Sequence, residues 1–407
     1  MQVTVHRGKA KGCVSAPPSK SMAHRLLICA GMCQGTSTVR GISGSEDVLA
    51  TLDCLRALGV ECERAGETVT VRGRDMRSAS PEGILSCRES GSTLRFMLPI
   101  ALLSGKNVML SGSKSLMQRP MDVYRTLCEE KGMVYLQDGE SVFVQGPLRA
   151  GDYAVVGNVS SQFISGLLFA LPVVEGDSTL RISTPIESRS YINLTIDALR
   201  TFGVEVVWQD EHTLFVRGGQ SYRPTDAEVE GDYSNAAFLD ALGLFGDTVT
   251  VSGLRENSIQ GDRVYRRYFD MLCKGTPTIH IGDCPDLGPI LFAVAAAKNG
   301  GIFNGTRRLR IKESDRASAM AEELRKLGTA VTVYEDTVVV YPADFHAPSE
   351  DLAGHNDHRI VMALSVLLTL TGGRIRGAEA VAKSYPDFFE AMRALGILVT
   401  EEEEGRA

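Results

Sequence analysis

The sequence has 407 residues, of which 43% are hydrophobic, and it carries a formal net charge of −7. A chain of this length exceeds what one hydrophobic core usually serves, so we expect two domains. The acidic balance argues against nucleic acid or a membrane surface as the main partner, although local basic clusters can still bind small anions.

The N-terminal segment alternates polar and apolar residues over positions 1–7, which predicts a strand and shows no signal-peptide core. Two prolines at 17 and 18 then end an extended entry, a serine in the following Ser-Lys-Ser segment is expected to cap a helix, and apolar residues recur at helical spacing. Lys20 and Arg25 fall in the first two turns of this helix. Cations there oppose the helix dipole unless an anion joins them, which predicts an anion site; the alternative is a solvated basic helix start.

A repeated unit follows along the chain. A helix-like segment that ends in a glycine, followed by two short alternating strands, occurs with its glycine at Gly59, Gly132, Gly203, Gly275, Gly328 and Gly396. We expect each glycine to take the left-handed conformation that ends a helix. Six units of the form β-α-β-α-β-β predict an α/β fold with two domains of three repeats each.

Each unit also contains a second helix with a polar start and an apolar run behind it. The starts lie at 19–21, 89–92, 160–162, 232–235, 285–288 and 356–359. Such helices should be buried, with only their N-termini showing. If these helices run parallel, their positive N-terminal ends point out of one face of each domain. Two such faces on either side of a cleft would then bind anions. The alternative is that the polar residues are only caps.

Short basic segments accompany these helix starts, at 117–121, 187–191, 307–316, 356–359 and 382–386. Taken singly, each is more often solvated surface or a local salt bridge. Together with the polar helix starts, they favour a site for small anionic ligands.

The nine cysteines form no C-x-x-C pair, and their number is odd. This pattern is typical of reduced thiols in a cytoplasmic protein, not of disulfides or zinc ligands. The longest apolar run, around 360–370, is too short to span a bilayer.

These motifs resemble the 5-enolpyruvylshikimate-3-phosphate synthase family over the whole chain. The motifs are PSKS at 18–21 with Arg25, SGSTLR at 90–95, QRP at 118–120, VSSQF at 159–163, PD at 285–286, IKESDR at 311–316, NDHR at 356–359 and KSYPDF at 383–388. The resemblance implies two domains of three βαβαββ units each, an inside-out α/β barrel, joined by a two-stranded hinge near 16–19 and 228–231. One domain would comprise 1–18 with 229–407, and the other 19–228.

The resemblance also implies the reaction. The enolpyruvyl group of phosphoenolpyruvate moves to the 5-hydroxyl of shikimate 3-phosphate, and phosphate leaves through a tetrahedral intermediate, on the route to chorismate and aromatic amino acids. No metal or organic cofactor is expected, nor a nucleic-acid or membrane partner, and the protein should be a monomer. The phosphoenolpyruvate pocket of the family also takes the herbicide glyphosate.

Site residues follow from the same resemblance. For shikimate 3-phosphate they are Lys20, Ser21, Arg25, Ser160, Ser161, Gln162, Ser188, Tyr191, Asp286 and Lys312. For phosphoenolpyruvate they are Lys20, Gly91, Arg119, Gln162, Arg316, Arg359 and Lys383. Planar arginine side chains suit carboxylate and phosphate oxygens, which lysine matches less specifically.

The chemistry needs a base for the 5-hydroxyl and an acid for the methylene carbon. We expect Asp286 to be the base and Glu313 the acid, with Lys20 and His358 as helpers. A carboxylate at a helix start prefers to be ionised, whereas the acid role of Glu313 requires a pKa raised by burial. Whether Lys20 or Glu313 delivers the proton stays open.

One position departs from some members of the family. Arg308 stands four residues before Lys312, where those members have asparagine. It could bind the sugar phosphate or point to solvent, and the sequence leaves both roles open.

Two other functions are alternatives for a chain with these repeats. The sister enolpyruvyl transferase that acts on UDP-N-acetylglucosamine should show a Lys-Asn pair near the N-terminus and a loop cysteine, whereas Ser21 follows Lys20 here. A non-enzymatic six-repeat clamp around DNA would need basic helices lining a hole, whereas this chain is acidic.

Overall fold

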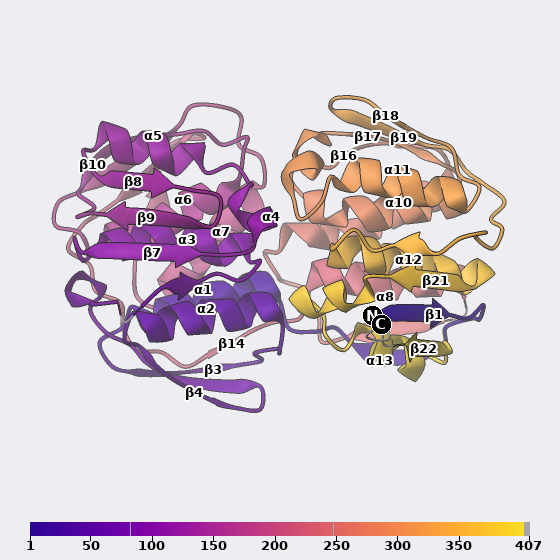
Figure 1. Ribbon diagram of the computed structural model, residues 1–407, viewed down its shortest axis with the longest axis horizontal. Coiled ribbons are helices and arrows are strands. Elements are labelled where there is room, and N and C mark those ends of the chain that lie inside the picture. Colours follow the sequence, from indigo (N-terminus) through magenta and orange to yellow (C-terminus); the bar gives the residue numbers. More distant parts are fainter. Residues whose placement is uncertain (82, 247, 403–407) are drawn as a thin grey trace. The chain divides into compact units, whose positions relative to one another are not determined.

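The computed structural model describes residues 1–407 except 82, 247 and 403–407 (Figure 1). The chain forms two compact units, Pro18–Glu230 and Met1–Pro17 with Gly231–Ala407. Each unit has its own hydrophobic core. Backbone hydrogen bonds join the two chain segments at the boundary of each unit. In the unit Pro18–Glu230, the Ser19 N–H donates to the Glu230 carbonyl, and in the other unit the Asp232 N–H donates to the Pro17 carbonyl, both at 2.8 Å.

The unit Pro18–Glu230 contains three four-stranded sheets with one shared order, β14-β3-β5-β4, β6-β7-β9-β8 and β10-β11-β13-β12. The first pair in each sheet is parallel and the other two pairs are antiparallel. Its strands are β3 (Thr36–Arg40), β4 (Glu61–Ala65), β5 (Thr68–Arg72), β6 (Leu85–Ser86), β7 (Asn107–Ser111), β8 (Val134–Gln137), β9 (Ser141–Gln145), β10 (Gly151–Val155), β11 (Ser178–Ile182), β12 (Val206–Trp208), β13 (Thr213–Val216) and β14 (Ala227–Glu228).

Its helices include three that are buried nearly all round, α1, α3 and α6. These carry apolar residues on every face, so they lie in the core, whereas strands such as β5 bury only alternate residues, Val69 and Val71. The helices are α1 (Lys20–Gly31), α2 (Glu46–Ala57), α3 (Gly91–Leu102), α4 (Lys114–Met117), α5 (Asp122–Glu130), α6 (Ser161–Ala170) and α7 (Arg189–Thr201), with 3-10 turns η1 (Met76–Ser78) and η2 (Leu171–Val173).

The other unit has two sheets of the same kind, β16-β17-β19-β18 and β20-β21-β1-β22, and a two-stranded sheet β15-β2. Its strands are β1 (Gln2–Val5), β2 (Gly12–Ser15), β15 (Val249–Ser252), β16 (Thr278–His280), β17 (Gly301–Asn304), β18 (Val331–Val333), β19 (Thr337–Val340), β20 (Leu352–Ala353), β21 (Gly373–Arg376) and β22 (Val399–Glu402). Its helices and 3-10 turns are α8 (Tyr233–Phe245), η3 (Gly261–Val264), α9 (Tyr265–Lys274), η4 (Pro285–Leu287), α10 (Gly288–Ala297), η5 (Arg307–Ile311), α11 (Arg316–Lys326), α12 (His358–Thr371), η6 (Ala378–Lys383) and α13 (Phe388–Ala394).

The expectation of six equal repeats is wrong for the copy that ends at Gly275. After α9 the chain runs directly into β16 of the next repeat, without a strand pair of its own. Gly275 accordingly has an extended backbone with φ 172°, so its predicted left-handed conformation is also wrong. The other helix-ending glycines are left-handed, with φ between 68° and 94°. A strand pair follows Gly59, Gly132, Gly203 and Gly328. After Gly396 the described residues form only β22, which pairs with β1, so the expectation of two following strands is wrong for this copy as well.

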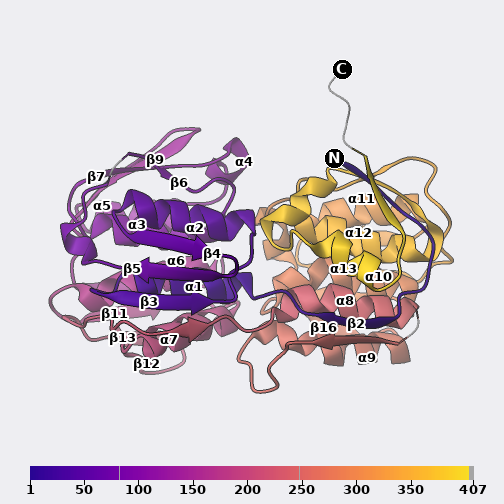
Figure 2. The ribbon, with the colours of Figure 1, turned by 90° about the horizontal axis from the view of Figure 1, so that it is seen from below.

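Two strands come from distant parts of the sequence. Strand β2, which precedes α1 in the chain, pairs in parallel with β15, and Figure 2 shows it in indigo among orange and yellow elements. Strand β14, which precedes α8, pairs in parallel with β3. Strands β2 and β15 are separated in the sequence by the whole of the unit Pro18–Glu230, whereas β3 and β14 are the first and last strands of that unit itself.

Within the described residues, no helix is both long enough and apolar enough to cross a bilayer. The apolar run near 360–370 lies in α12, which is buried in the core. All nine cysteines are free thiols, and most of them are buried.

Candidate active site

The expected site residues fall into two groups, one in each unit. The unit Pro18–Glu230 contains Lys20, Ser21, Arg25, Gly91, Arg119, Ser160, Ser161, Gln162, Ser188 and Tyr191. The other unit contains Asp286, Lys312, Glu313, Arg316, His358, Arg359 and Lys383.

In the unit Pro18–Glu230, the N-terminal ends of four packed helices are tied together. Helix α3 packs on α6, α6 on α7, and α7 on α1. Gln162 at the start of α6 donates to Ser92 Oγ at the start of α3 (2.8 Å) and accepts from Arg95 Nη1 (2.7 Å). Arg25 Nη2 of α1 donates to the Tyr191 carbonyl in the first turn of α7 (3.0 Å). Because the joined residues lie in the first two turns of their helices, the positive helix ends lie close together, as an anion site requires.

Arg25 is a fixed cation behind these helix ends. Its side chain is buried, with Nε donating to Thr195 Oγ1 at 2.8 Å and Nη1 to the Ser21 carbonyl at 2.7 Å. Burial lowers the pKa of Arg25 to about 10, which still leaves it charged at neutral pH. The guanidinium is therefore held rigidly and adds positive potential to the region.

Lys20 lies at the first position of α1, behind the N-cap Ser19. Its Nζ forms an ion pair with Asp47 Oδ2 of α2 at 2.7 Å. Asp47 was not predicted from the sequence, because an acidic residue in the opening turn of a helix is too common to identify a partner in another helix.

Gly91 and Arg119 are close neighbours. A Cβ at position 91 would lie 2.8 Å from Arg119 Nη1 and 3.5 Å from Arg95 Nη1. The glycine therefore lets the Arg119 guanidinium approach the start of α3. Arg95 in turn donates to the carbonyl of Pro120, next to Arg119, at 3.1 Å.

Ser160, Ser161 and Ser188 are buried at helix starts, whereas Ser21 in the first turn of α1 is half-buried. Ser160 caps α6 by accepting the Gln162 N–H, and Ser161 is the first residue of that helix. Ser188 precedes α7 with φ 60°, a left-handed conformation that is unusual for a non-glycine residue. Backbone strain of this kind is typical of functional sites, and no pattern in the sequence predicts it.

The second group is built around Asp286, in η4 just before α10. Its Oδ1 lies 2.9 Å from Arg316 Nη1 and 3.2 Å from Lys312 Nζ, and its Oδ2 lies 3.3 Å from Arg359 Nη2. The Asp286 side chain is 21% exposed. Three cations around one partly exposed carboxylate favour its ionised form.

Arg316, the first residue of α11, is only 1% exposed and contacts three carboxylates. Its Nε lies 2.8 Å from Asp357 Oδ2, and its Nη2 lies 2.7 Å from Glu313 Oε2. Burial by itself lowers the pKa of Arg316, but Asp357, Glu313 and Asp286 outweigh that effect and raise it. An incoming anion must therefore compete with protein carboxylates for this guanidinium.

The start of α12 joins the same group. Asp357 caps this helix, accepts the Arg359 N–H and is fully buried. Arg359 Nη2 donates to Ser234 Oγ in the first turn of α8 at 2.9 Å. His358 is buried beside them, and Lys383 Nζ donates to the Asn356 carbonyl at 2.6 Å. The opening turns of α8 and α12 thus meet at Asp286, just before α10.

Two further points concern Lys312 and Arg308. Burial lowers the pKa of the Lys312 ammonium, and Asp286 partly offsets this effect. Arg308 is buried and its Nη1 donates to the Gly282 carbonyl at 3.4 Å, so the solvent-facing role considered for it is wrong. Its charge also contributes to the lowered pKa of Lys312.

The sequence matches a known protein family over most of its length. The family model described as EPSP synthase (3-phosphoshikimate 1-carboxyvinyltransferase) matches residues 5–272 and 266–392. A 3-phosphoshikimate 1-carboxyvinyltransferase of Clostridium kluyveri is 37% identical over 431 aligned positions, which cover 99% of each chain. One of Clostridium acetobutylicum is 39% identical over 409 aligned positions, which cover 95% of each.

Solved structures show the same architecture. An EPSP synthase from Acinetobacter baumannii superposes with a TM-score of 0.80 at 25% identity, covering 98% of this chain and 100% of that one. The enolpyruvyl transferase NikO from Streptomyces tendae shares the fold, with a TM-score of 0.77 at 18% identity and 98% coverage of each chain.

Proposed function

The chain belongs to the EPSP synthase (3-phosphoshikimate 1-carboxyvinyltransferase) family, and from that premise we propose how its two groups of side chains divide the reaction. As an enolpyruvyl transferase of the shikimate pathway, it moves the enolpyruvyl group of phosphoenolpyruvate to shikimate 3-phosphate.

Shikimate 3-phosphate binds at the gathered helix starts of the unit Pro18–Glu230. The hydroxyls of Ser21, Ser160, Ser161 and Ser188 and the amide of Gln162 supply neutral hydrogen bonds, and Arg25 supplies positive potential. The tied ends of α1, α3, α6 and α7 support this assignment, because helix N–H groups and dipoles favour a dianionic phosphate. Lys312 and Asp286 are the contacts assigned to the other unit.

Phosphoenolpyruvate carries a phosphate and a carboxylate, and arginine suits both groups. Arg119 and Gly91 are assigned to it in one unit, and Arg316, Arg359 and Lys383 in the other. Lys20 and Gln162 contact it as well. The reaction therefore requires both units.

Asp286 takes the proton of the 5-hydroxyl. Lys312, Arg316 and Arg359 keep its carboxylate ionised in the absence of substrate, as a general base must be. This three-cation contact is the observation that carries the proposal.

The acid role of Glu313 needs one additional step. Its ion pair with Arg316 favours the carboxylate form, which has no proton to give. We therefore expect the anionic groups of phosphoenolpyruvate to draw Arg316 away, so that Glu313 takes up the proton that it delivers to the methylene carbon. Lys20 is the second candidate for this proton, and His358 helps by its position beside Asp357 and Arg359.

The test is phosphate release from phosphoenolpyruvate with each acceptor in turn. Shikimate 3-phosphate should support release, and UDP-N-acetylglucosamine should not. Release with the nucleotide sugar alone would overturn the assignment. We further propose a cytoplasmic monomer with no nucleic-acid or membrane partner, which light scattering and a duplex-DNA titration would test.

A further inference from the structure

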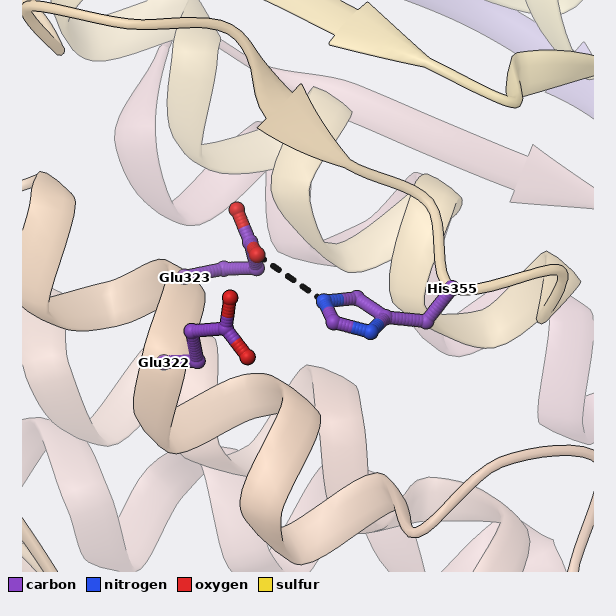
Figure 3. A group of neighbouring side chains, drawn as sticks. All are labelled: Glu322, Glu323 and His355. Carbon is purple, nitrogen blue, oxygen red and sulfur yellow. Dashed lines mark hydrogen bonds and ion pairs between the residues drawn. The ribbon is translucent and has the colours of Figure 1, made fainter.

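A buried carboxylate lies on α11, two turns after Arg316 (Figure 3). The Glu323 side chain is 0% exposed, its Oε1 lies 2.8 Å from His355 Nε2, and its Oε2 accepts the Ala353 N–H at 3.0 Å. Lys326 Nζ lies 3.1 Å from Oε2. Glu322, Glu323 and His355 have the spacing of metal ligands, but the Lys326 ammonium already supplies a cation to this carboxylate. The contacts point instead to a role in holding residues 353–355.

Residues 353–357 form the connection between β20 and α12, and their backbone is strained. His355 and Asn356 have φ of 50° and 51°, two consecutive left-handed residues without a glycine. Such conformations persist only where surrounding contacts hold them. Here Glu323 holds Ala353 and His355 from one side, and Lys383 donates to the Asn356 carbonyl.

This connection ends in the candidate site. Asp357 caps α12 and binds Arg316, and Arg359 contacts Asp286. Arg316 and Glu323 stand seven positions apart, so they lie on one face of α11. That face therefore holds both ends of the connection, Ala353 and His355 through Glu323, and Asp357 through Arg316.

We infer that Glu323 and His355 are positioning residues for enolpyruvyl transfer: their contact holds residues 353–357, in which His355 and Asn356 are left-handed, and thereby sets Asp357 and Arg359 in place. The inference rests on the proposed function, because its effect on catalysis passes through the phosphoenolpyruvate contact of Arg359. Neither residue is expected to touch substrate.

The contact is charge-assisted when His355 is protonated. Hydrogen bonding to Glu323 raises the pKa of His355 above its ordinary value, and the charges facing the imidazole are Glu323, Glu322 and Lys326 of α11, with Lys383 of η6 on the adjoining carbonyl. Because the pKa of His355 is raised in the folded protein, the added stability is fully present below the ordinary pKa. It is lost as the pH rises through the raised pKa.

The experiment compares Glu323→Gln and His355→Gly with the wild type in steady-state kinetics across pH. Both variants should raise the KM for phosphoenolpyruvate by about tenfold or more, because displacing a substrate contact by a fraction of an ångström is costly. The KM for shikimate 3-phosphate should change less than about twofold, since its assigned contacts lie mainly in the other unit. The effect of His355→Gly should be largest at low pH and shrink as the pH rises through the pKa of His355.

Glu322→Gln is the matched control. It removes the same charge from the neighbouring position of α11, where the side chain is more than half exposed and makes no hydrogen bond to residues 353–355, so at low pH its KM for phosphoenolpyruvate should match that of the wild type. His355→Gly keeps a left-handed backbone acceptable, so it tests the imidazole contact even if Glu323→Gln does not fold. Wild-type kinetics in His355→Gly at every pH would overturn the inference. Absence of phosphate release by the wild-type protein would instead overturn the proposed function.

Discussion

At the scale of single residues, the site pairs its cations with protein carboxylates. Arg316 contacts Asp286, Glu313 and Asp357, and Lys20 contacts Asp47. The sequence motifs identified most of the cations, because each stands in a short basic segment at a helix start. They did not identify Asp47 or the structural use of Asp357, since these contacts join residues 27 and 41 positions apart and depend on how helices pack.

The first prediction concerns Asp286. Asp286→Asn should lower kcat by about two to four orders of magnitude, the scale expected for a lost general base. Substrate dissociation constants should stay near normal, because the three neighbouring cations remain in place. Single-turnover kinetics and calorimetric titration would separate the two effects. Asp283→Asn, an exposed neighbour, is the control, and normal turnover in Asp286→Asn would show that another group is the base.

A second prediction concerns Arg119. Arg119→Ala removes charge-assisted hydrogen bonds worth about 1.5 to 3 kcal/mol each, so the KM for phosphoenolpyruvate should rise at least about tenfold. Arg125→Ala removes an equal charge from an arginine that pairs with Asp122 near the surface, and it should leave the KM unchanged. A similar KM for phosphoenolpyruvate in both variants would contradict the assignment of Arg119 to the phosphoenolpyruvate site.

At the scale of elements, buried helices and their starts were the most predictable feature. Apolar residues on all faces of α10 or α12 leave no other place for these helices than the core. The strand pairing was less predictable, because β2 and β14 find partners far away in the sequence. The missing hairpin after Gly275 was signalled only by the short spacing to Gly328, since 276–281 alternates like any strand.

The start of α3 carries the third prediction. A methyl group at position 91 would lie 2.8 Å from Arg119 Nη1, so Gly91→Ala must displace that guanidinium and narrow the pocket. The longer ligand glyphosate should lose more affinity than phosphoenolpyruvate, as expected when a steric block is added against one competitor. In the wild type, glyphosate should inhibit the reaction competitively with phosphoenolpyruvate. Equal losses for both ligands would indicate that Gly91 serves only the backbone.

At the scale of the whole molecule, the repeated plan was visible in the sequence, except that the copy ending at Gly275 lacks its own strand pair. The recurring glycines and polar helix starts predicted it, and the resemblance added the discontinuous domain. The repeat pattern predicts the hydrophobic core of each unit. It does not predict how the two units respond when anionic ligands bind.

The fourth prediction is therefore ligand-induced compaction. The residues assigned to phosphoenolpyruvate come from both units, and anions bound by both sets of cations should hold the units together. Small-angle scattering should show a smaller radius of gyration with shikimate 3-phosphate plus glyphosate than without ligand. Shikimate 3-phosphate alone is the control for a single-ligand effect. An unchanged radius with both ligands would contradict closure.

The central claim is that this chain transfers an intact enolpyruvyl group by adding a proton to the methylene carbon and then removing one. The direct measurement is mass spectrometry and proton NMR of the product formed from phosphoenolpyruvate and shikimate 3-phosphate in D2O. We predict 5-enolpyruvylshikimate 3-phosphate with deuterium in its methylene group, because the carbon passes through a methyl stage that receives a solvent-derived deuteron. Phosphate release without an enolpyruvyl product, or a product whose methylene group carries no deuterium, would contradict the account.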